Sequence, residues 1–221
     1  MAKRTVAQAI LREIKLQLGM HDYSFAEEAS CQELNIFKKE TETTRIAFQY
    51  TLSGRGAYSA SGTLKIIYPD LTTILQKLFE GTAFAAHYES DSLSNPWSGV
   101  GIESNIERFS NESLTYRCAS EDDATAFSKY FVRQLLAAEQ AFVLPHLDPA
   151  ITVQAFMKPM HGFWPGPVRT FLEHLIAYGI KTSDAPMISY ALQKAADVCG
   201  KLVPEARPLA FIATLKRQIE Q

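Results

Sequence analysis

Residues 44 to 68 constrain the fold most strongly, because apolar and polar side chains alternate there over two runs. The first run has an apolar side chain at every second position, at Ile46, Phe48, Tyr50 and Leu52. Gly54 and Gly56 can take positive φ in a turn, and Leu64 and Ile66 continue the period of two beyond it. Because successive side chains of a strand point to opposite faces, this pattern predicts a β-hairpin with one buried face.

The opposite face of the predicted hairpin is polar, and most of its side chains are small. It consists of Arg45, Ala47, Gln49, Thr51, Ser59, Ser61 and Thr63. A face of this composition has to meet either water or another molecule. We therefore treat it as a candidate binding surface.

Local patterns predict further strands and helices on both sides of the hairpin. Apolar residues at helical spacing predict a helix over about 6–18, opened by a Thr5-x-x-Gln8 capping box and ended by Gly19. Strands are expected near 34–37, 84–88, 102–109 and 114–118, with a short helix after Pro69 and a turn over 38–42. A long helix is expected after Ser120-x-x-Asp123, lasting to Pro145, and all that follows residue 167 is predicted to be helical.

These elements predict an α+β fold. Its antiparallel sheet has about five or six strands within residues 33–120, preceded by an N-terminal helix and followed by a long helix and a C-terminal group of helices. We expect an α+β domain over residues 1–145 and a helical subdomain over 146–221, packed on the first.

Composition and motifs restrict the classes of protein to which this chain can belong. The chain has 221 residues, of which 47% are hydrophobic and 21% charged, with a net charge of −2, which is typical of a globular protein and lacks the basic excess of a nucleic-acid-binding one. Its three cysteines lie far apart, so no disulfide framework or metal-ligand spacing is predicted. No apolar run is long enough for a signal peptide or a membrane span, so we expect a cytoplasmic protein.

Motifs for cofactor and phosphate binding are absent, and we expect no cofactor. Gly54-Arg-Gly56 begins like a dinucleotide-binding loop, but it lacks the third glycine and precedes a strand instead of a helix. Two titratable pairs remain for an enzyme of unrecognised type, namely His87 with Glu89 and His146 with Asp148. Two such groups alone specify neither a nucleophile nor a pocket.

The centre of the chain is acidic, and its loops carry both tryptophans. The candidate binding residues are Glu89, Asp91, Trp97, Glu103, Glu107 and Trp164. Large rigid aromatic side chains in Pro/Gly-rich loops can anchor an interface, and complementary charge steers the encounter of two proteins. This combination predicts a basic protein partner.

The order of elements, with an amphipathic helix, a polar-faced hairpin, further strands and a long helix, is similar to that of small uncharacterised bacterial domains, including some immunity proteins that neutralise toxins. That resemblance implies a non-catalytic protein that binds and inhibits its partner. The hypothesis is therefore a protein-binding module of inhibitor or immunity type. The alternatives are an enzyme using one of the two histidine pairs and a small-molecule-binding domain.

Overall fold

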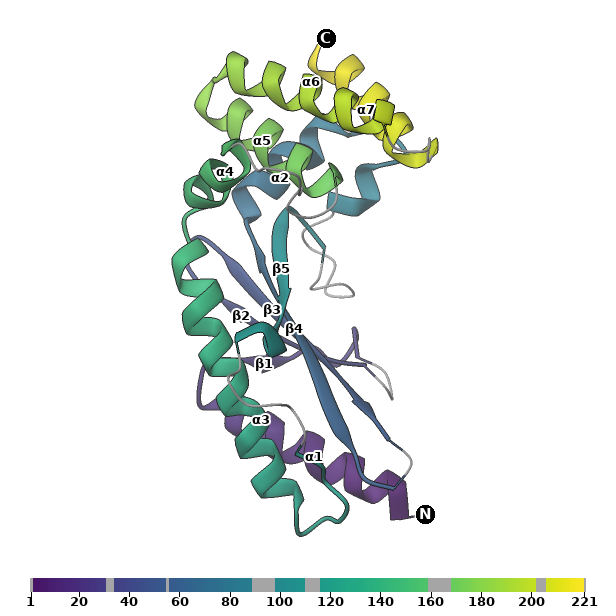
Figure 1. Cartoon of the computed structure of the whole chain (residues 1–221), viewed down its shortest axis with the longest axis vertical. Helices are drawn as coiled ribbons and strands as arrows, with labels where there is room; N and C mark the ends of the chain where they lie inside the picture. Colours follow the sequence, from purple (N-terminus) through teal and green to yellow (C-terminus); the bar gives the residue numbers. More distant parts are fainter. Residues whose placement is uncertain are drawn as a thin grey trace. The chain divides into compact units, whose positions relative to one another are not determined.

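A computed structural model describes residues 2–30, 34–54, 56–88, 98–109, 116–158, 168–201 and 206–220 (Figure 1). The chain divides into two compact units, each described here by itself. The first comprises residues 1–66, 93–97 and 103–147, and the second comprises residues 67–92, 98–102 and 148–221. Whether residues 1–145 and 146–221 are separate domains stays a prediction.

The sheet has five strands in the order β1-β2-β3-β4-β5, so each strand pairs with its neighbour in sequence. The strands are β1 (Ser24–Phe25), β2 (Leu34–Glu40), β3 (Arg45–Ser53), β4 (Ser59–Ile67) and β5 (Gly101–Asn105). The register of β2 against β3 sets Phe37 opposite Phe48. With the N-terminal helix and the helices that follow the sheet, this arrangement confirms the predicted α+β fold.

The inner face of the sheet is the apolar face that the alternation predicts. Phe48, Tyr50, Leu64 and Ile66 are all buried. Helix α3 (Ala124–Ala138) packs on this face through Phe131, whose ring centroid lies 5.9 Å from that of Phe48 and 5.5 Å from that of Tyr50. The core of the first unit therefore lies between the sheet and its helices (Figure 1).

The ends of the helices differ in part from the predicted ones. Helix α1 (Ala2–Gly19) ends at Gly19 as predicted, but it already includes Thr5, so the predicted cap at Thr5 is wrong. At α3 the predicted pair is formed, because Asp123 accepts hydrogen bonds from the amide and hydroxyl of Ser120, and the Ser120 hydroxyl accepts one from the Asp123 amide. These bonds lie in the turn before α3, whose N-cap residue is Asp123 without a side-chain cap bond, so the predicted cap at Ser120 is wrong in position.

Two predicted boundaries and one predicted strand are wrong. The predicted turn over 38–42 lies later, because β2 continues to Glu40 and Thr41 bonds to Thr44 in the turn. In place of a strand at 84–88 there is a 3-10 helix, η1 (Ala85–Tyr88), which follows a turn where the Thr82 hydroxyl accepts from the Phe84 amide. The expected strand over 102–109 ends at Asn105 and continues as a 3-10 helix, η2 (Ile106–Phe109).

The long helix also ends earlier than Pro145. After Ala138 the chain widens into one turn of π-helix, η3 (Glu139–Val143), and then tightens into a 3-10 turn, η4 (Leu144–His146). Of the expected strand over 114–118, residues 114 and 115 lie outside the described residues. Cys118 forms only an isolated bridge with Tyr58.

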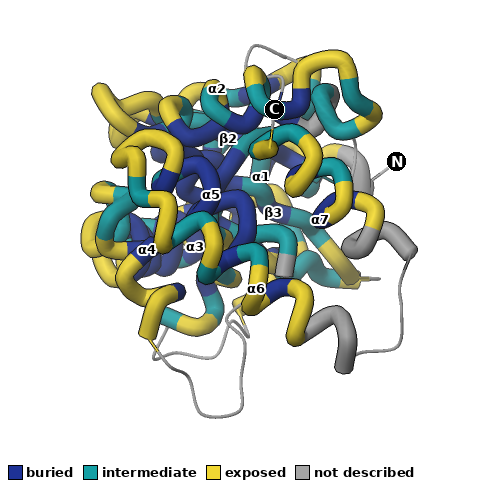
Figure 2. Tube along the Cα trace, turned by 90° about the horizontal axis from the view of Figure 1, so that it is seen from above, coloured by how far each residue is buried: buried dark blue, intermediate teal, exposed yellow. Residues whose placement is uncertain are grey.

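The second unit is helical around one central helix. Its helices are α2 (Pro69–Leu78), α4 (Pro149–Met157), α5 (Val168–Thr182), α6 (Ala185–Lys201) and α7 (Ala206–Ile219). Residues 171–177 of α5 are all buried, and Figure 2 shows α5 dark blue among partly exposed helices. A helix that is buried all round is the centre of its unit.

We expect Gly62→Ala to lower the free energy of unfolding by about 1–3 kcal/mol, the usual effect of overpacking a core. A Cβ at Gly62 would lie 2.8 Å from Cε2 of Phe48 and 3.0 Å from Cδ1 of Ile106. Gly56→Ala is the control, because a Cβ there meets nothing within 4 Å. Chemical denaturation of both variants measures the difference, and equal stabilities would contradict this packing.

Candidate functional site

The structure describes two of the six candidate binding residues. Glu89, Asp91, Trp97 and Trp164 lie outside the described residues. Glu103 is exposed on β5, and Glu107 is partly exposed on η2. Both belong to the first unit, so the described part of the predicted site lies at the β5 side of the sheet.

The Glu107 carboxylate closes the edge of β4. Its Oε1 accepts a hydrogen bond of 3.1 Å from the amide of Gly62. On the same edge the Tyr58 amide donates to Cys118, and the Thr63 hydroxyl donates to Asn105. The side chain of Glu107 thus replaces a strand partner where β5 gives way to η2. This contact explains Glu107 without a ligand, and its role in binding stays a prediction.

The edge of β2, at the other end of the strand order, is closed in a similar way. The Ile36 amide donates to the Ser30 hydroxyl at 3.0 Å, and the Ile36 carbonyl accepts from the Ala26 amide at 2.9 Å. Unpaired edges invite pairing with another chain, and side chains that occupy edge groups prevent it. These contacts occupy backbone groups at the edges of β2 and β4.

We define the outer sheet face as the outward side chains of β3, β4 and β5 that the structure leaves at least partly accessible. They are Arg45, Gln49, Thr51, Ser53, Ser59, Ser61, Thr63, Lys65, Glu103 and Asn105, so the face carries two cations as well as the carboxylate of Glu103. Their hydroxyls pair across the strands, with 2.9 Å between Thr51 and Ser61 and 3.1 Å between Ser53 and Ser59. Thr63 donates to the Asn105 side chain at 3.2 Å. The middle of the face therefore consists of short polar side chains that cross-strand hydrogen bonds hold in fixed positions.

The outer side of the sheet is not polar throughout. Ala47, predicted on the accessible face, is fully buried, and so is Ile36 on the outward side of β2. Arg45 is partly exposed, and its Nε lies 2.7 Å from the carboxylate of Glu40. The candidate surface is accordingly confined to the β3–β5 part of the sheet.

Neither histidine pair is shown as an assembled acid-base pair. The side chain of His87 and all of Glu89 lie outside the description. His146 lies in the first unit, and its Nδ1 is 2.7 Å from the carbonyl oxygen of Phe142. Asp148 lies in the second unit, where it caps α4 by accepting from the Ala150 amide at 2.9 Å. Local contacts thus account for both described members.

The sequence analysis did not predict two buried glutamates, each of which binds side chains from separate segments of its own unit. In the first unit Glu139 accepts from the Tyr23 hydroxyl at 3.0 Å and from Lys39 at 2.9 Å. The three residues come from the π-helix, the loop before β1, and β2. Burial and the adjacent Glu139 raise the pKa of Tyr23, so its hydroxyl stays protonated and donates.

The second unit contains a cluster of the same kind. Glu173 of α5 accepts from the Tyr88 hydroxyl at 2.7 Å and from Nε of Arg169 at 2.6 Å. The guanidinium also lies over the ring of Phe211, 5.4 Å from its centroid, and so joins α7 to α5. The Arg169–Glu173 pair has helical i,i+4 spacing and could have been predicted from the sequence. The other partners lie up to 116 residues apart in the chain, so no local pattern predicts them.

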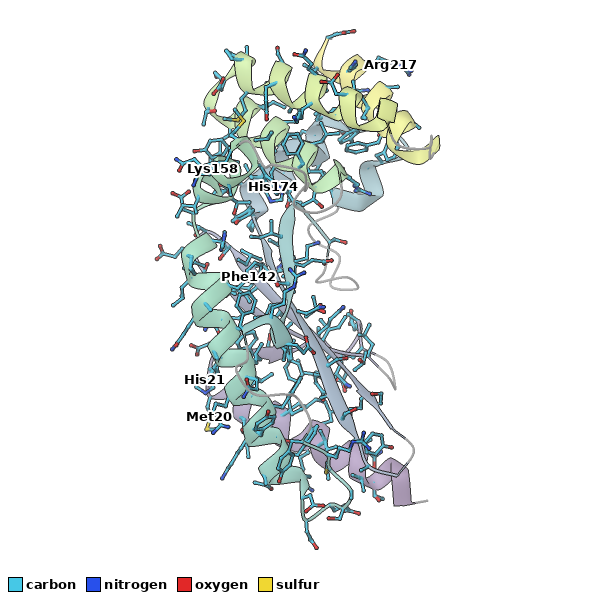
Figure 3. All side chains as sticks on the ribbon, in the orientation of Figure 1. Met20, His21, Phe142, Lys158, His174 and Arg217 are labelled. Carbon is cyan, nitrogen blue, oxygen red and sulfur yellow. The ribbon has the colours of Figure 1, made fainter. Side chains whose placement is uncertain are left out.

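A third polar group lies beside α5, where the Tyr68 hydroxyl is 2.8 Å from that of Thr152. The ring of His174, buried on α5, lies edge-on to Tyr68 at 5.7 Å between centroids, and its Nδ1 is 2.6 Å from the carbonyl of Thr170. Figure 3 labels His174 on this helix. Burial raises the pKa of Tyr68 to about 12.

Within the described ranges, no three His, Cys, Asp or Glu side chains gather where they could hold a metal ion. A search of the same ranges finds no helix with the length and apolar character needed to cross a bilayer.

We expect Glu107→Ala to lower the free energy of unfolding by about 1–3 kcal/mol, because the buried Gly62 amide loses its acceptor. Glu107→Gln keeps a side-chain oxygen that can accept from the Gly62 amide, so it should lower the free energy of unfolding less. Urea denaturation of both variants measures the two effects. Wild-type stability for the alanine variant would show that the carboxylate does not close this edge.

Alkaline pH should destabilise the protein partly through Tyr68. The pKa of Tyr68 rises from 10.0 to about 12 on folding. Its contribution to the free energy of unfolding is therefore complete below pH 10 and is lost as the pH rises from about 10 to 12. The loss for this residue is roughly 2–3 kcal/mol. The unfolding free energies of wild type and Tyr68→Phe, measured from pH 8 to 12, should converge over that interval, and a constant difference would contradict the assignment.

In comparisons with family models, curated proteins and solved structures, nothing matches this chain. The same class of fold can carry unrelated functions. Any function therefore has to rest on the side chains described above.

Proposed function

We propose that this protein is a non-catalytic binding module that docks a basic protein partner on its outer sheet face. The observation that carries the proposal is the fixed array of short polar side chains on β3, β4 and β5, with the exposed carboxylate of Glu103 among them. An inhibitor or immunity-type role agrees with such a module, since an inhibitor needs only to bind.

The hydroxyl pairs make this face suitable for binding. Serine and threonine lose little rotamer entropy when they are immobilised, and here cross-strand bonds already fix their positions. Binding therefore orders few groups, which lowers its entropic cost. Each paired hydroxyl oxygen keeps a lone pair that can accept a hydrogen bond from a partner's lysine or arginine.

Charge supports a basic partner on the β5 side of this face. Glu103 is exposed there, and the acidic residues Glu89 and Asp91 and the candidate anchor Trp97 precede β5 in the chain. An acidic rim mainly raises the association rate and excludes acidic competitors. Trp97 is the proposed aromatic anchor of this contact.

Affinity capture at low ionic strength, from a lysate of the cells that produce the protein, tests this proposal. We expect a basic protein to be retained by the wild type and to dissociate as salt is raised. Glu103→Lys should weaken its binding by roughly tenfold, equivalent to about 1.4 kcal/mol, because a cation replaces the carboxylate that faces the partner. Ser61→Arg should weaken it further by placing a long cation in the middle of the face.

The matched control is Asp197→Lys, which changes the net charge equally at an exposed site of α6 in the other unit. Binding should be unchanged in this variant. Equal binding by all three variants, or capture of acidic proteins alone, would refute docking on the outer sheet face.

A further inference from the structure

His174 is a fully buried titratable residue in the middle of α5, the central helix of the second unit. Its Nε2 is buried from water as well. The ordinary pKa of histidine is about 6.5, so a modest change in acidity alters the charge of this side chain when water can reach it. The docking proposed for the outer sheet face does not use His174, which belongs to the other unit.

A hydrogen bond within α5 fixes which ring nitrogen of His174 carries a hydrogen. Nδ1 lies 2.6 Å from the carbonyl oxygen of Thr170, one turn earlier in the helix. Because a carbonyl oxygen can only accept, Nδ1 donates in both charge states of the ring. The proton that makes the ring cationic is therefore taken up at Nε2, the nitrogen that is buried.

Two aromatic rings face His174, one from α4 and one from the residue before α2. The ring centroid of Phe156 lies 5.3 Å from that of His174, and the ring of Tyr68 lies edge-on at 5.7 Å. The Tyr68 hydroxyl is in turn 2.8 Å from that of Thr152 on α4. Removing an imidazolium from water into such surroundings is costly, so this packing favours the neutral ring.

The charged residues of α2 and of the ends of α4 lie in water. They are Asp70, Lys77, Asp148 and Lys158, all exposed. Asp70 pairs with Lys181 of α5 at 3.0 Å. Asp148 contributes to the raised pKa of Tyr68, so its negative charge acts on this side of α5. Water screens that charge, which therefore offsets only part of the cost of burying an imidazolium.

Charged residues on α5 and α6 have other surroundings. Glu173 precedes His174 in the chain, but consecutive residues of a helix point about 100° apart, and its carboxylate is bound by Tyr88 and Arg169. Helix α6 contacts another part of α5, where the ring of Tyr190 lies 6.3 Å from that of Phe171. Its described charged residues are Lys194 and Asp197, which are exposed, and Asp184 before it accepts from the Met187 amide.

His146 in the first unit offers an internal comparison. Its Nδ1 lies 2.7 Å from the carbonyl oxygen of Phe142, one turn earlier, so it makes the same local contact as His174. His146 is partly exposed, however, and water can therefore solvate its charged form. The difference between the two histidines is their burial.

We infer that His174 is an acid-sensitive switch of the second unit, whose protonation at the buried Nε2 releases the packing of α4 and Tyr68 on α5. At neutral pH the uncharged ring is part of the core. When this packing opens, the ring meets water and takes up a proton below about pH 6.5, whereas the packed ring stays neutral. The opened state thus binds more protons, so the stability of the packed state falls as the pH falls. The inference is independent of the proposed docking.

Urea denaturation of the full chain at pH 7 and pH 5 tests this switch. His174→Asn removes the titrating ring and keeps a side-chain N–H group that can donate to Thr170. Between the two pH values the unfolding constant of the wild type should rise roughly 25-fold more than that of this variant. The matched control is His146→Asn, which removes a histidine with the same local contact and should keep the wild-type response.

Two measurements on the wild type keep the inference testable if His174→Asn does not fold. In nuclear magnetic resonance spectra the His174 ring should keep its neutral chemical shifts while α5 remains packed. Hydrogen exchange, corrected for intrinsic rates, should be faster at pH 5 than at pH 7 in α4 and α5 but unchanged in β3. A His174 ring that titrates near pH 6.5 in the folded protein would overturn the inference. Equal acceleration in β3, or the same pH response in wild type and His174→Asn, would overturn it too.

Discussion

Packing of Phe131 against Phe48 and Tyr50 joins the long helix to the sheet, and the arrangement of the first unit depends on it. The contact requires the apolar residues of β3 and β4 to lie on one face. A register shift by one residue would bury the serine and threonine hydroxyls and expose the rings. The same contact positions α3, against which α1 packs, so the outer sheet face and both helices depend on one core.

The carboxylates show why an acidic sequence need not form an acidic surface. Glu107 bonds the Gly62 amide at the edge of β4. Glu139 and Glu173 are each bound by a tyrosine hydroxyl and a cation inside their own units. A buried carboxylate requires such partners, because desolvation of an unpaired charge is expensive. Of the two described residues of the predicted site, Glu103 is exposed and Glu107 is partly exposed.

The outer sheet face suits recognition by hydrogen bonds more than by apolar burial. The outer sheet face presents short hydroxyls in fixed positions, which favours hydrogen bonding with little loss of entropy.

The sequence by itself determined the hairpin, its buried face and most helices, because these depend on periodicity within about ten residues. It also predicted the reciprocal bonds of Ser120 and Asp123, which are local. The predicted strand at 84–88 is wrong, because the alternation of Phe84, Ala86 and Tyr88 is too short to distinguish a strand from a turn followed by a 3-10 helix. Only the tertiary structure decided that Glu107, Glu139 and Glu173 serve the fold, because their partners are brought to them by packing between segments remote in the chain. Exposure of Leu16 was decided in the same way, since the packing of α1 on α3 determines which apolar residues of α1 remain in water.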